Sequence, residues 1–161
     1  MESQPSQTSV IPYKRSRFQT RLPTDRVYTP SHFWLLETGP GAYRVGFTRF
    51  ATRMLGEVVE HGFEVKPGAT VKVGQTIGWV EGFKAMSDLY CVCDGSFSGG
   101  NPEIEADPTL TDSDPYGRGW LYAVRNATPE PNGMPVRKYM ELLDMTIDKM
   151  QGKSGGESSS Q

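Results

Sequence analysis

The stretch "QTIGWVEGFKAMSDLYCV" (residues 75–92) decides the fold, because it has the pattern of a β-hairpin with a lysine at its tip. The first strand is expected to end near Glu81 and the second to begin near Met86, which leaves Gly82–Ala85 for the turn. The side chain at such a tip projects into water, so Lys84 is expected to be exposed. Exposed lysines are largely protonated at neutral pH and are poor nucleophiles. Lys84 is therefore better suited to being acylated by another enzyme than to catalysis.

Short strand-like segments surround this hairpin. "HFWLLE" (32–37) and "AYRVGF" (42–47) are joined by the turn "TGPG", and further short segments follow between residues 57 and 98. "GWLYAV" (119–124) predicts one more strand. Such closely spaced short strands predict a mainly β fold.

Two helices are expected beside these strands. "TRFATRMLGE" (48–57) predicts a short side helix, with Thr48 as its N-cap and Gly56 as its stop. "MPVRKYMELLDMTIDKMQ" (134–151) predicts a longer amphipathic C-terminal helix, with Pro135 in its first turn. Its apolar stripe, which is expected to pack in the core, consists of Met140, Leu143, Ile147 and Met150.

The 161-residue chain is expected to hold one domain with extensions at both ends. Residues 1–26 are polar and basic and predict a flexible N-terminal arm. Residues 27–150 are expected to form the folded domain. Residues 151–161, which are rich in Gly and Ser, predict a disordered tail.

The charge argues against a nucleic-acid partner, because 17 basic and 19 acidic residues give a net charge of −2. No apolar run is long enough to cross a bilayer, so no membrane partner is expected either. The charge is unevenly placed, with basic residues at 12–21 and acids at 102–114. The acidic stretch either serves solubility or docks a basic partner enzyme.

The two cysteines, Cys91 and Cys93, are separated by one residue. They are too few for a structural zinc site, since only His32 and His61 could complete it. No metal site is therefore expected. The thiols either pack in the core or have a redox role near the lysine. Two free thiols fit a reducing cytoplasm better than secretion, so the expected location is cytoplasmic.

Several collinear segments resemble the H protein of the glycine cleavage system. "VEGFKAMSDLY" (80–90) resembles the family's lipoyl-attachment loop, in which the lysine stands in the context E-S-V-K-A-x-S-D-L-Y. "YTPSHFWL" (28–35), "YRVGFTRFATRMLGEVV" (43–59) and "DPYGRGWLYAV" (114–124) resemble three further family motifs. The resemblance covers most of residues 27–150.

This resemblance implies a flattened lipoyl/biotinyl-type β-barrel sandwich, and a carrier protein with no catalytic activity of its own. Lipoic acid would be bound covalently to Lys84. Glu81 and the turn glycine Gly68 would be recognised by the lipoate-attaching enzyme. His32 would either hydrogen-bond within the core or line the cleft that shelters the arm.

The sequence departs from the family pattern at several places. Phe33 replaces a glutamate of the motif H-E-W, which removes a carboxylate near the lipoyl cleft. Gly82 and Phe83 replace Ser-Val before the lysine, which is expected to give the arm a softer and more apolar root. The segment 90–102 contains both cysteines, and residues 1–26 are additional.

"EGFKAMSDLYCV", "GGNPEIEADP" and "LLDMTIDKM" resemble H-like lipoate-binding proteins of heterodisulfide-reductase-like sulfur oxidation. The favoured expectation is therefore a lipoyl arm that carries sulfur intermediates for that complex. The alternative is a glycine cleavage H protein that carries an aminomethyl group. Dihydrolipoamide dehydrogenase is a further expected partner. A third possibility is an interaction protein without lipoate, although Lys84, Glu81, Ala85 and Gly68 are all present.

Overall fold

The computed structural model describes residues 9–152. The expectations for residues 1–8 and 153–161 lie outside this part of the chain. The described elements follow in chain order: β1 (Val10–Arg15), β2 (Phe18–Pro23), β3 (Val27–Tyr28), β4 (Phe33–Gly39), β5 (Ala42–Phe47), α1 (Arg49–Leu55), β6 (Val58–Phe63), β7 (Thr70–Val71), β8 (Thr76–Gly82), β9 (Met86–Tyr90), β10 (Cys93–Gly100), α2 (Pro102–Ala106), α3 (Leu110–Ser113), β11 (Tyr122–Pro129) and α4 (Val136–Met150).

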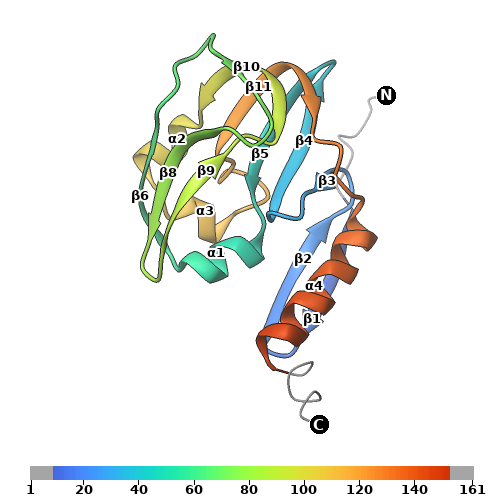
Figure 1. The fold of residues 1–161 in the computed structure, drawn as a ribbon. Coiled ribbons are helices and arrows are strands. Elements are labelled where there is room, and N and C mark those ends of the chain that lie inside the picture. Colours follow the sequence, from blue (N-terminus) through green and yellow to red (C-terminus); the bar gives the residue numbers. More distant parts are fainter. Residues whose placement is uncertain (1–8, 153–161) are drawn as a thin grey trace, which may run out of the picture.

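Two sheets face each other around the main core and form the flattened sandwich (Figure 1). The larger sheet has the order β3-β4-β5-β11-β10-β7, and the smaller has the order β6-β8-β9. All of their pairings are antiparallel. Side chains of both sheets bury one contiguous apolar cluster, whose largest members include Leu35, Ile77, Leu89, Phe97 and Tyr122. The predicted mainly β sandwich is therefore confirmed.

Local sequence signals account for the helix that lies beside the smaller sheet. The Thr48 hydroxyl accepts a hydrogen bond from the Ala51 amide and caps the start of α1. Gly56 ends the helix with a φ of 77°, a conformation that glycine adopts without steric cost. The helix and both of its predicted boundaries are thus confirmed. In Figure 1 this helix lies at the end of the sandwich where β8 turns into β9.

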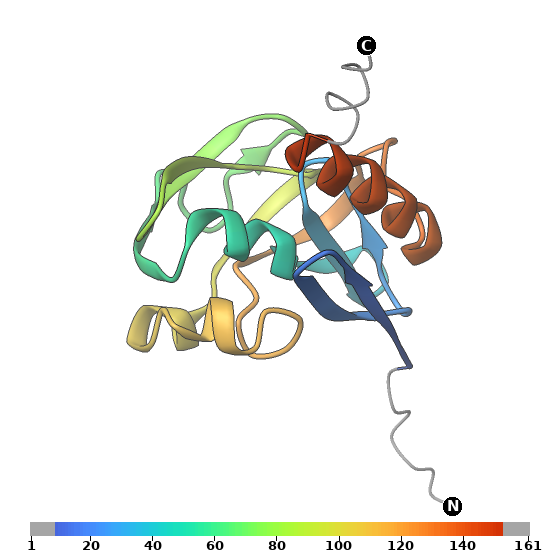
Figure 2. The same ribbon diagram turned by 90° about the horizontal axis from the view of Figure 1, so that it is seen from below.

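The prediction of a flexible arm is wrong for residues 10–23. β1 and β2 form an antiparallel hairpin that packs beside α4 (Figures 1 and 2). Tyr13, Phe18 and Leu22 are buried in a second apolar cluster, together with the buried face of α4. Burial of these three side chains stabilises the hairpin. These three residues are spaced irregularly in a polar segment and show no alternation typical of a strand. The sequence therefore gave no basis for predicting this hairpin.

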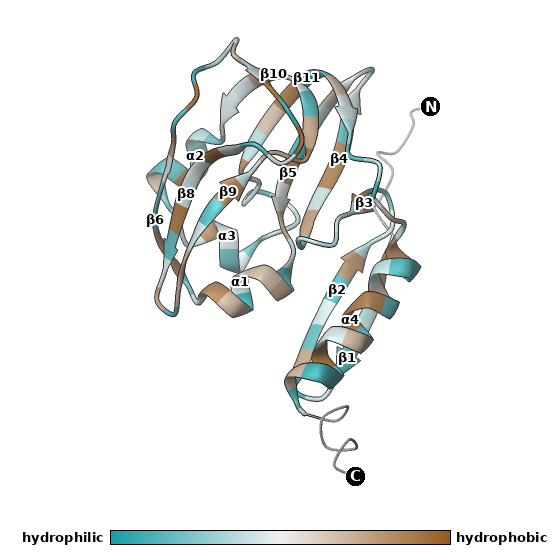
Figure 3. Ribbon diagram, viewed as in Figure 1, coloured by the Kyte–Doolittle hydropathy of each residue, from teal (hydrophilic) through white to brown (hydrophobic). Residues whose placement is uncertain are grey.

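The C-terminal helix begins at Val136, with Pro135 as its N-cap. The core prediction is confirmed for Leu143 and Ile147, which are buried, but it is wrong for Met150, which is 56% exposed. Figure 3 shows hydrophobic and hydrophilic bands alternating along α4. Within residues 9–152, no helix is long and apolar enough to cross a membrane.

The acidic segment forms the short helices α2 and α3, which the sequence did not predict. The Asn101 side chain, which is buried, accepts from the Glu103 amide and donates to the carbonyls of Arg118 and Trp120. It thereby fixes the start of α2 to the segment before β11. Glu103 also forms an ion pair with Arg118, so part of the acidic charge is neutralised within the chain.

Candidate functional site

The predicted hairpin tip is present, and it presents Lys84 to solvent. β8 ends at Gly82, β9 begins at Met86, and the Gly82 amide donates to the Ala85 carbonyl at 2.9 Å. Lys84 is exposed, and its neighbour Phe83 is 74% exposed. The tip therefore offers an accessible primary amine beside exposed apolar side chains.

The backbone of this tip is fixed to the end of α1. The Lys84 amide donates to the Leu55 carbonyl at 2.8 Å, and the Phe83 amide donates to the Glu57 carbonyl at 3.0 Å. The last carbonyls of a helix lack partners within the helix and accept hydrogen bonds from elsewhere. The tip provides such a donor for Leu55, the last residue of α1. The lysine thus projects from an anchored turn.

Two glycines allow the tip and the helix end to approach this closely. A β-carbon at position 82 would overlap the Leu55 carbonyl oxygen, and one at position 56 would lie 2.9 Å from the Lys84 amide nitrogen. Gly82 is also buried. The expectation that Gly82 softens the root of the arm is therefore wrong, because this glycine permits a tight contact between two backbones.

The Lys84 side chain lies back across α1. Its Nζ donates to the Arg53 carbonyl at 3.1 Å. No carboxylate within residues 9–152 forms an ion pair with this amine. An exposed amine without a carboxylate partner is open to acylation by an enzyme that approaches from solvent.

The two predicted recognition residues lie in different places. Glu81 is on β8, three residues before Lys84, and is half-buried. Gly68 follows β6, whose last residue, Phe63, pairs with Gly78, so it lies beyond the end of this sheet that is distant from the tip. Its φ of 96° and the hydrogen bond that its backbone amide donates to the Phe97 carbonyl identify a turn residue. The structure brings Glu81, but not Gly68, close to the lysine.

A cleft of about 220 Å³ lies between α1, β9 and the start of β4. His32 lines it, together with Asp88 and Tyr90 of β9. Phe33, which stands where the family pattern has glutamate, also lines this cleft. Its ring stacks on that of Phe47, with the ring centroids 5.3 Å apart. This cleft is consequently apolar, with Asp88 as its acidic group.

His32 hydrogen-bonds within the core, which is one of the two roles that the sequence left open, and it also lines this cleft. Besides lining the cleft, its Nδ1 lies 2.8 Å from the Tyr139 hydroxyl, which in turn lies 2.8 Å from the Thr48 hydroxyl. Desolvation by burial lowers the pKa of His32 to about 4. The imidazole is therefore neutral at pH 7 and joins the start of β4 to α4.

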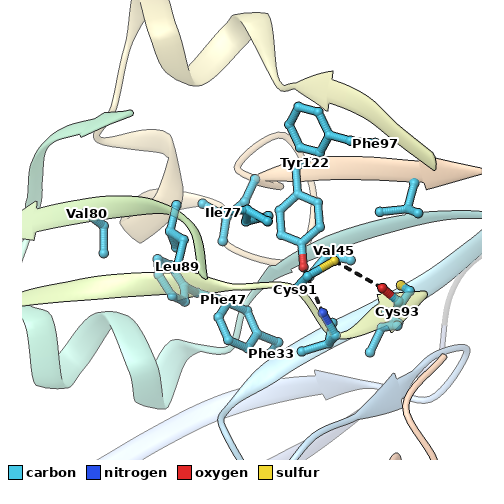
Figure 4. Packing of buried hydrophobic residues seen from close by; sticks show 14 of the residues in the cluster. Phe33, Val45, Phe47, Ile77, Val80, Leu89, Cys91, Cys93, Phe97 and Tyr122 are labelled. Carbon is cyan, nitrogen blue, oxygen red and sulfur yellow. Dashed lines mark hydrogen bonds between the residues drawn. The ribbon is translucent and has the colours of Figure 1, made fainter. Parts of the chain in front are cut away.

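The cysteines lie in the main core, away from the tip. Cys91 follows the end of β9 and donates from Sγ to the Cys93 carbonyl at 3.1 Å, as Figure 4 shows. Both residues are almost fully buried, and neither forms a disulfide. Burial raises the pKa of the Cys91 thiol and raises that of Cys93 to about 12. These observations favour the packing role, since the reactive form of cysteine is the thiolate.

Sequence reasoning missed the residues on which the tip rests. It identified the end of α1 but not its contact with the hairpin, because Leu55 and Lys84 are far apart in the chain. It also missed the β1–β2 turn, whose Arg17 lines the same cleft as Lys84. The paired glycines at 56 and 82 were the available signal for a close backbone contact.

Comparisons with known proteins agree with this geometry. A family model described as "Glycine cleavage H-protein" matches residues 26–144. The glycine cleavage system H protein of Mycolicibacterium vanbaalenii is 40% identical over 111 residues, which cover 68% of this chain and 82% of the relative. That of Bordetella pertussis is 43% identical over 106 residues, which cover 66% and 83%. The crystal structure of a glycine cleavage system H protein from Mycobacterium marinum matches with a TM-score of 0.66 and 35% identity, covering 73% of this chain and 95% of that one.

Proposed function

The chain belongs to the glycine cleavage H-protein family, and from this premise we propose that it carries lipoic acid as an amide on Lys84. The observation that carries the proposal is the exposed Lys84 amine on a hairpin tip whose backbone is hydrogen-bonded to the end of α1. A fixed tip with a long side chain suits a carrier, because a tethered group reaches several enzymes at high effective concentration.

The residues around Lys84 fit a lipoyl group. The exposed Phe83 and Met86 offer apolar contacts to an aliphatic chain. Acylation removes the positive charge of Nζ but leaves one N–H, which can still donate to the Arg53 carbonyl. The lipoyl group supplies a disulfide that can be reduced and can exchange with thiols. The chain itself holds and presents this group and needs no catalytic residue.

Glu81 and Gly68 are proposed to direct lipoylation in different ways. Glu81 is near enough to Lys84 to contact the lipoate-attaching enzyme together with the lysine. Gly68 follows the end of β6 that is distant from the tip, so a direct contact requires an enzyme footprint along the whole length of the smaller sheet.

The partner system that the comparisons favour is glycine cleavage. The relatives described above are named glycine cleavage system H proteins and are about 40% identical. The proposed partners are accordingly the decarboxylase and the aminomethyl-transferase of that system, with dihydrolipoamide dehydrogenase to reoxidise the arm. The comparisons favour this reading over the sulfur carrier expected from the sequence.

One observation keeps the sulfur carrier as a second candidate. Phe33 lines the cleft near His32 where the family pattern has a carboxylate, and a carboxylate would attract a cationic aminomethyl load. The apolar substitution weakens that attraction and suits a load without positive charge. The cysteines do not support the sulfur carrier, because neither Cys91 nor Cys93 reaches the surface.

Lipoylation is tested by mass spectrometry of the full chain after incubation with a lipoate-attaching enzyme, ATP and lipoate. We expect one lipoyl group on Lys84, located by peptide mapping, and none on the control Lys84→Arg, which keeps the charge but cannot be acylated in this way. An unmodified wild-type chain, beside a lipoylated H protein in the same reaction, would overturn the proposal.

The partner system is tested with the lipoylated chain. It is mixed with glycine, the glycine decarboxylase and the aminomethyl-transferase, and the release of carbon dioxide is followed. Turnover comparable to that of an authentic H protein supports glycine cleavage and excludes a dedicated sulfur carrier. Absent turnover from a fully lipoylated chain favours the second candidate.

A further inference from the structure

The β1–β2 hairpin forms one wall of a second cleft, and Lys84 lies at its edge. This cleft has a volume of about 280 Å³ and is bounded by the β1–β2 turn, α1 and the end of α4. The hairpin precedes residues 26–144, the region that matches the family model. This wall is therefore formed by a segment outside the family match.

The cleft has an apolar surface. Phe18 of β2 packs edge-to-face on Phe50 of α1, with ring centroids 5.5 Å apart. Met54 and Met150 also line the cleft, and they are 44% and 56% exposed. Flexible methionine side chains adapt to ligands of irregular shape. The surface suits an aliphatic chain that ends in a sulfur ring.

Arginines give the cleft a positive charge. Arg15 is neutralised, because it forms ion pairs with Asp148 at 2.7 Å and with Asp144 at 3.4 Å. Arg17 and Arg53 also line the cleft, and within residues 9–152 neither forms an ion pair. Two guanidinium groups that have no acidic partner among the described residues favour a neutral or anionic ligand over a cationic one.

Given lipoylation at Lys84, which is the proposed function, we propose that this cleft binds the lipoyl arm. The geometry provides the tether, since the Lys84 Nζ lies at the cleft and donates to the Arg53 carbonyl. The aliphatic chain and the dithiolane lie against Phe18, Met54 and Met150. An arm that ends in a neutral or negative group is retained there, and an arm that ends in a positive group is repelled.

The cleft near His32 is the competing position. Phe50 and Met54 of α1 line both clefts, so the two clefts border on the same side chains. Asp88 lines only the His32 cleft, and Arg17 and Arg53 line only the other. The charge at the end of the arm thus selects between the two positions.

The first test uses methyl NMR of the full chain labelled at methionine methyl groups. Intact mass first establishes complete lipoylation, so a failure of the proposed function is recognised separately as an absent mass shift. The reduced arm is then alkylated either with iodoacetate, which adds a negative group, or with bromoethylamine, which adds a positive one. We expect the carboxymethylated arm to shift the Met150 resonance and the aminoethylated arm to leave it near its position in the unlipoylated chain.

Met145, 70% exposed and outside the cleft, is the internal control. A Met150 resonance that the arm leaves unchanged, or that both loads shift equally, would overturn the proposal.

The second test measures how fast the reduced arm reacts with N-ethylmaleimide. After one thiol of the reduced arm is carboxymethylated, the remaining thiol of the fully lipoylated variant Arg17→Glu/Arg53→Glu should react with N-ethylmaleimide about two- to fivefold faster than that of the wild type, since exposed ion pairs contribute up to about 1 kcal/mol. Arg21→Glu on β2 is the matched control, because Arg21 is exposed but does not line this cleft. Equal rates in all three proteins would contradict binding of the arm in this cleft.

Discussion

The Lys84 amide donates a 2.8 Å hydrogen bond to the carbonyl of Leu55, the last residue of α1. This contact joins the tip of the β8–β9 hairpin to a helix that is far away in the sequence. It fixes the backbone from which the lysine projects, while the Lys84 side chain remains exposed. The orientation of Lys84 thus depends on the helix end as well as on the hairpin.

Gly82→Ala should disturb this contact. The added β-carbon would overlap the Leu55 carbonyl oxygen, and overpacking of this kind costs about 1–3 kcal/mol. We expect a lower free energy of unfolding in urea and slower lipoylation of Lys84, because the tip must move away from α1. Gly39→Ala is the control, since a β-carbon there has no neighbour within 4 Å. If both variants match the wild type in stability and lipoylation rate, the tip is not held by close contact.

His32→Asn should change the pH dependence of stability. In the folded chain desolvation lowers the pKa of His32 to about 4, below its ordinary value of 6.5. Between these values the unfolded chain takes up a proton that the folded chain does not, so stability is full above pH 6.5 and falls towards pH 4. The loss should be about 1–3 kcal/mol, given that the residue is only partly buried.

Asparagine suits position 32 because the residue has a φ of 71°, which asparagine tolerates better than most residues. The comparison is made by urea unfolding of both proteins at pH 4.5, 5.5 and 7. The stability of His32→Asn should fall less steeply with acid than that of the wild type. If the stabilities of the two proteins fall equally with acid, His32 takes up its proton equally readily in the folded and the unfolded chain. Lipoylation at pH 7 should be retained, because Lys84 does not depend on the imidazole.

The thiols of Cys91 and Cys93 should be unreactive in the folded chain. Both are buried, and burial raises the pKa of Cys93 to about 12. Reaction then requires opening of the core, so it should be slower than reaction of the reduced lipoyl arm by on the order of a thousandfold or more. Titration of the lipoylated, reduced chain should show two fast thiols and two more in denaturant. Four fast thiols would restore a redox role for the cysteines.

Local signals in the sequence were sufficient for the hairpin tip and for α1. The turn between Gly82 and Ala85, the N-cap Thr48 and the stop at Gly56 each depend on a few neighbouring residues. The family motifs then indicated the role of Lys84. What the sequence did not show was the contact between these two elements, because pairing of distant backbones has no periodic signal.

The second cleft was hidden for a related reason. Phe18 lies in a polar, basic segment and becomes part of a core only when α4 and Phe50 cover it. Charge alone made Arg17 resemble part of a flexible arm, whereas the β1–β2 turn places it in the lining of the cleft that Lys84 also lines. Composition identifies segments that cannot bury enough apolar surface by themselves. It does not show that the apolar side chains of such a segment are buried by packing against an element elsewhere in the chain.

Leu22→Ala tests whether the β1–β2 hairpin is part of the cooperative fold. Leu22 is fully buried beside α4, and truncation of a buried leucine costs about 2–5 kcal/mol. We expect a loss of this size in urea unfolding, whereas the surface control Val10→Ala on the same hairpin should change stability by at most about 0.5 kcal/mol. A flexible arm would make both substitutions equally mild. Because the hairpin also forms the wall of the arginine-containing cleft, a destabilised Leu22→Ala chain should still accept lipoate on Lys84 but leave the arm more accessible to N-ethylmaleimide.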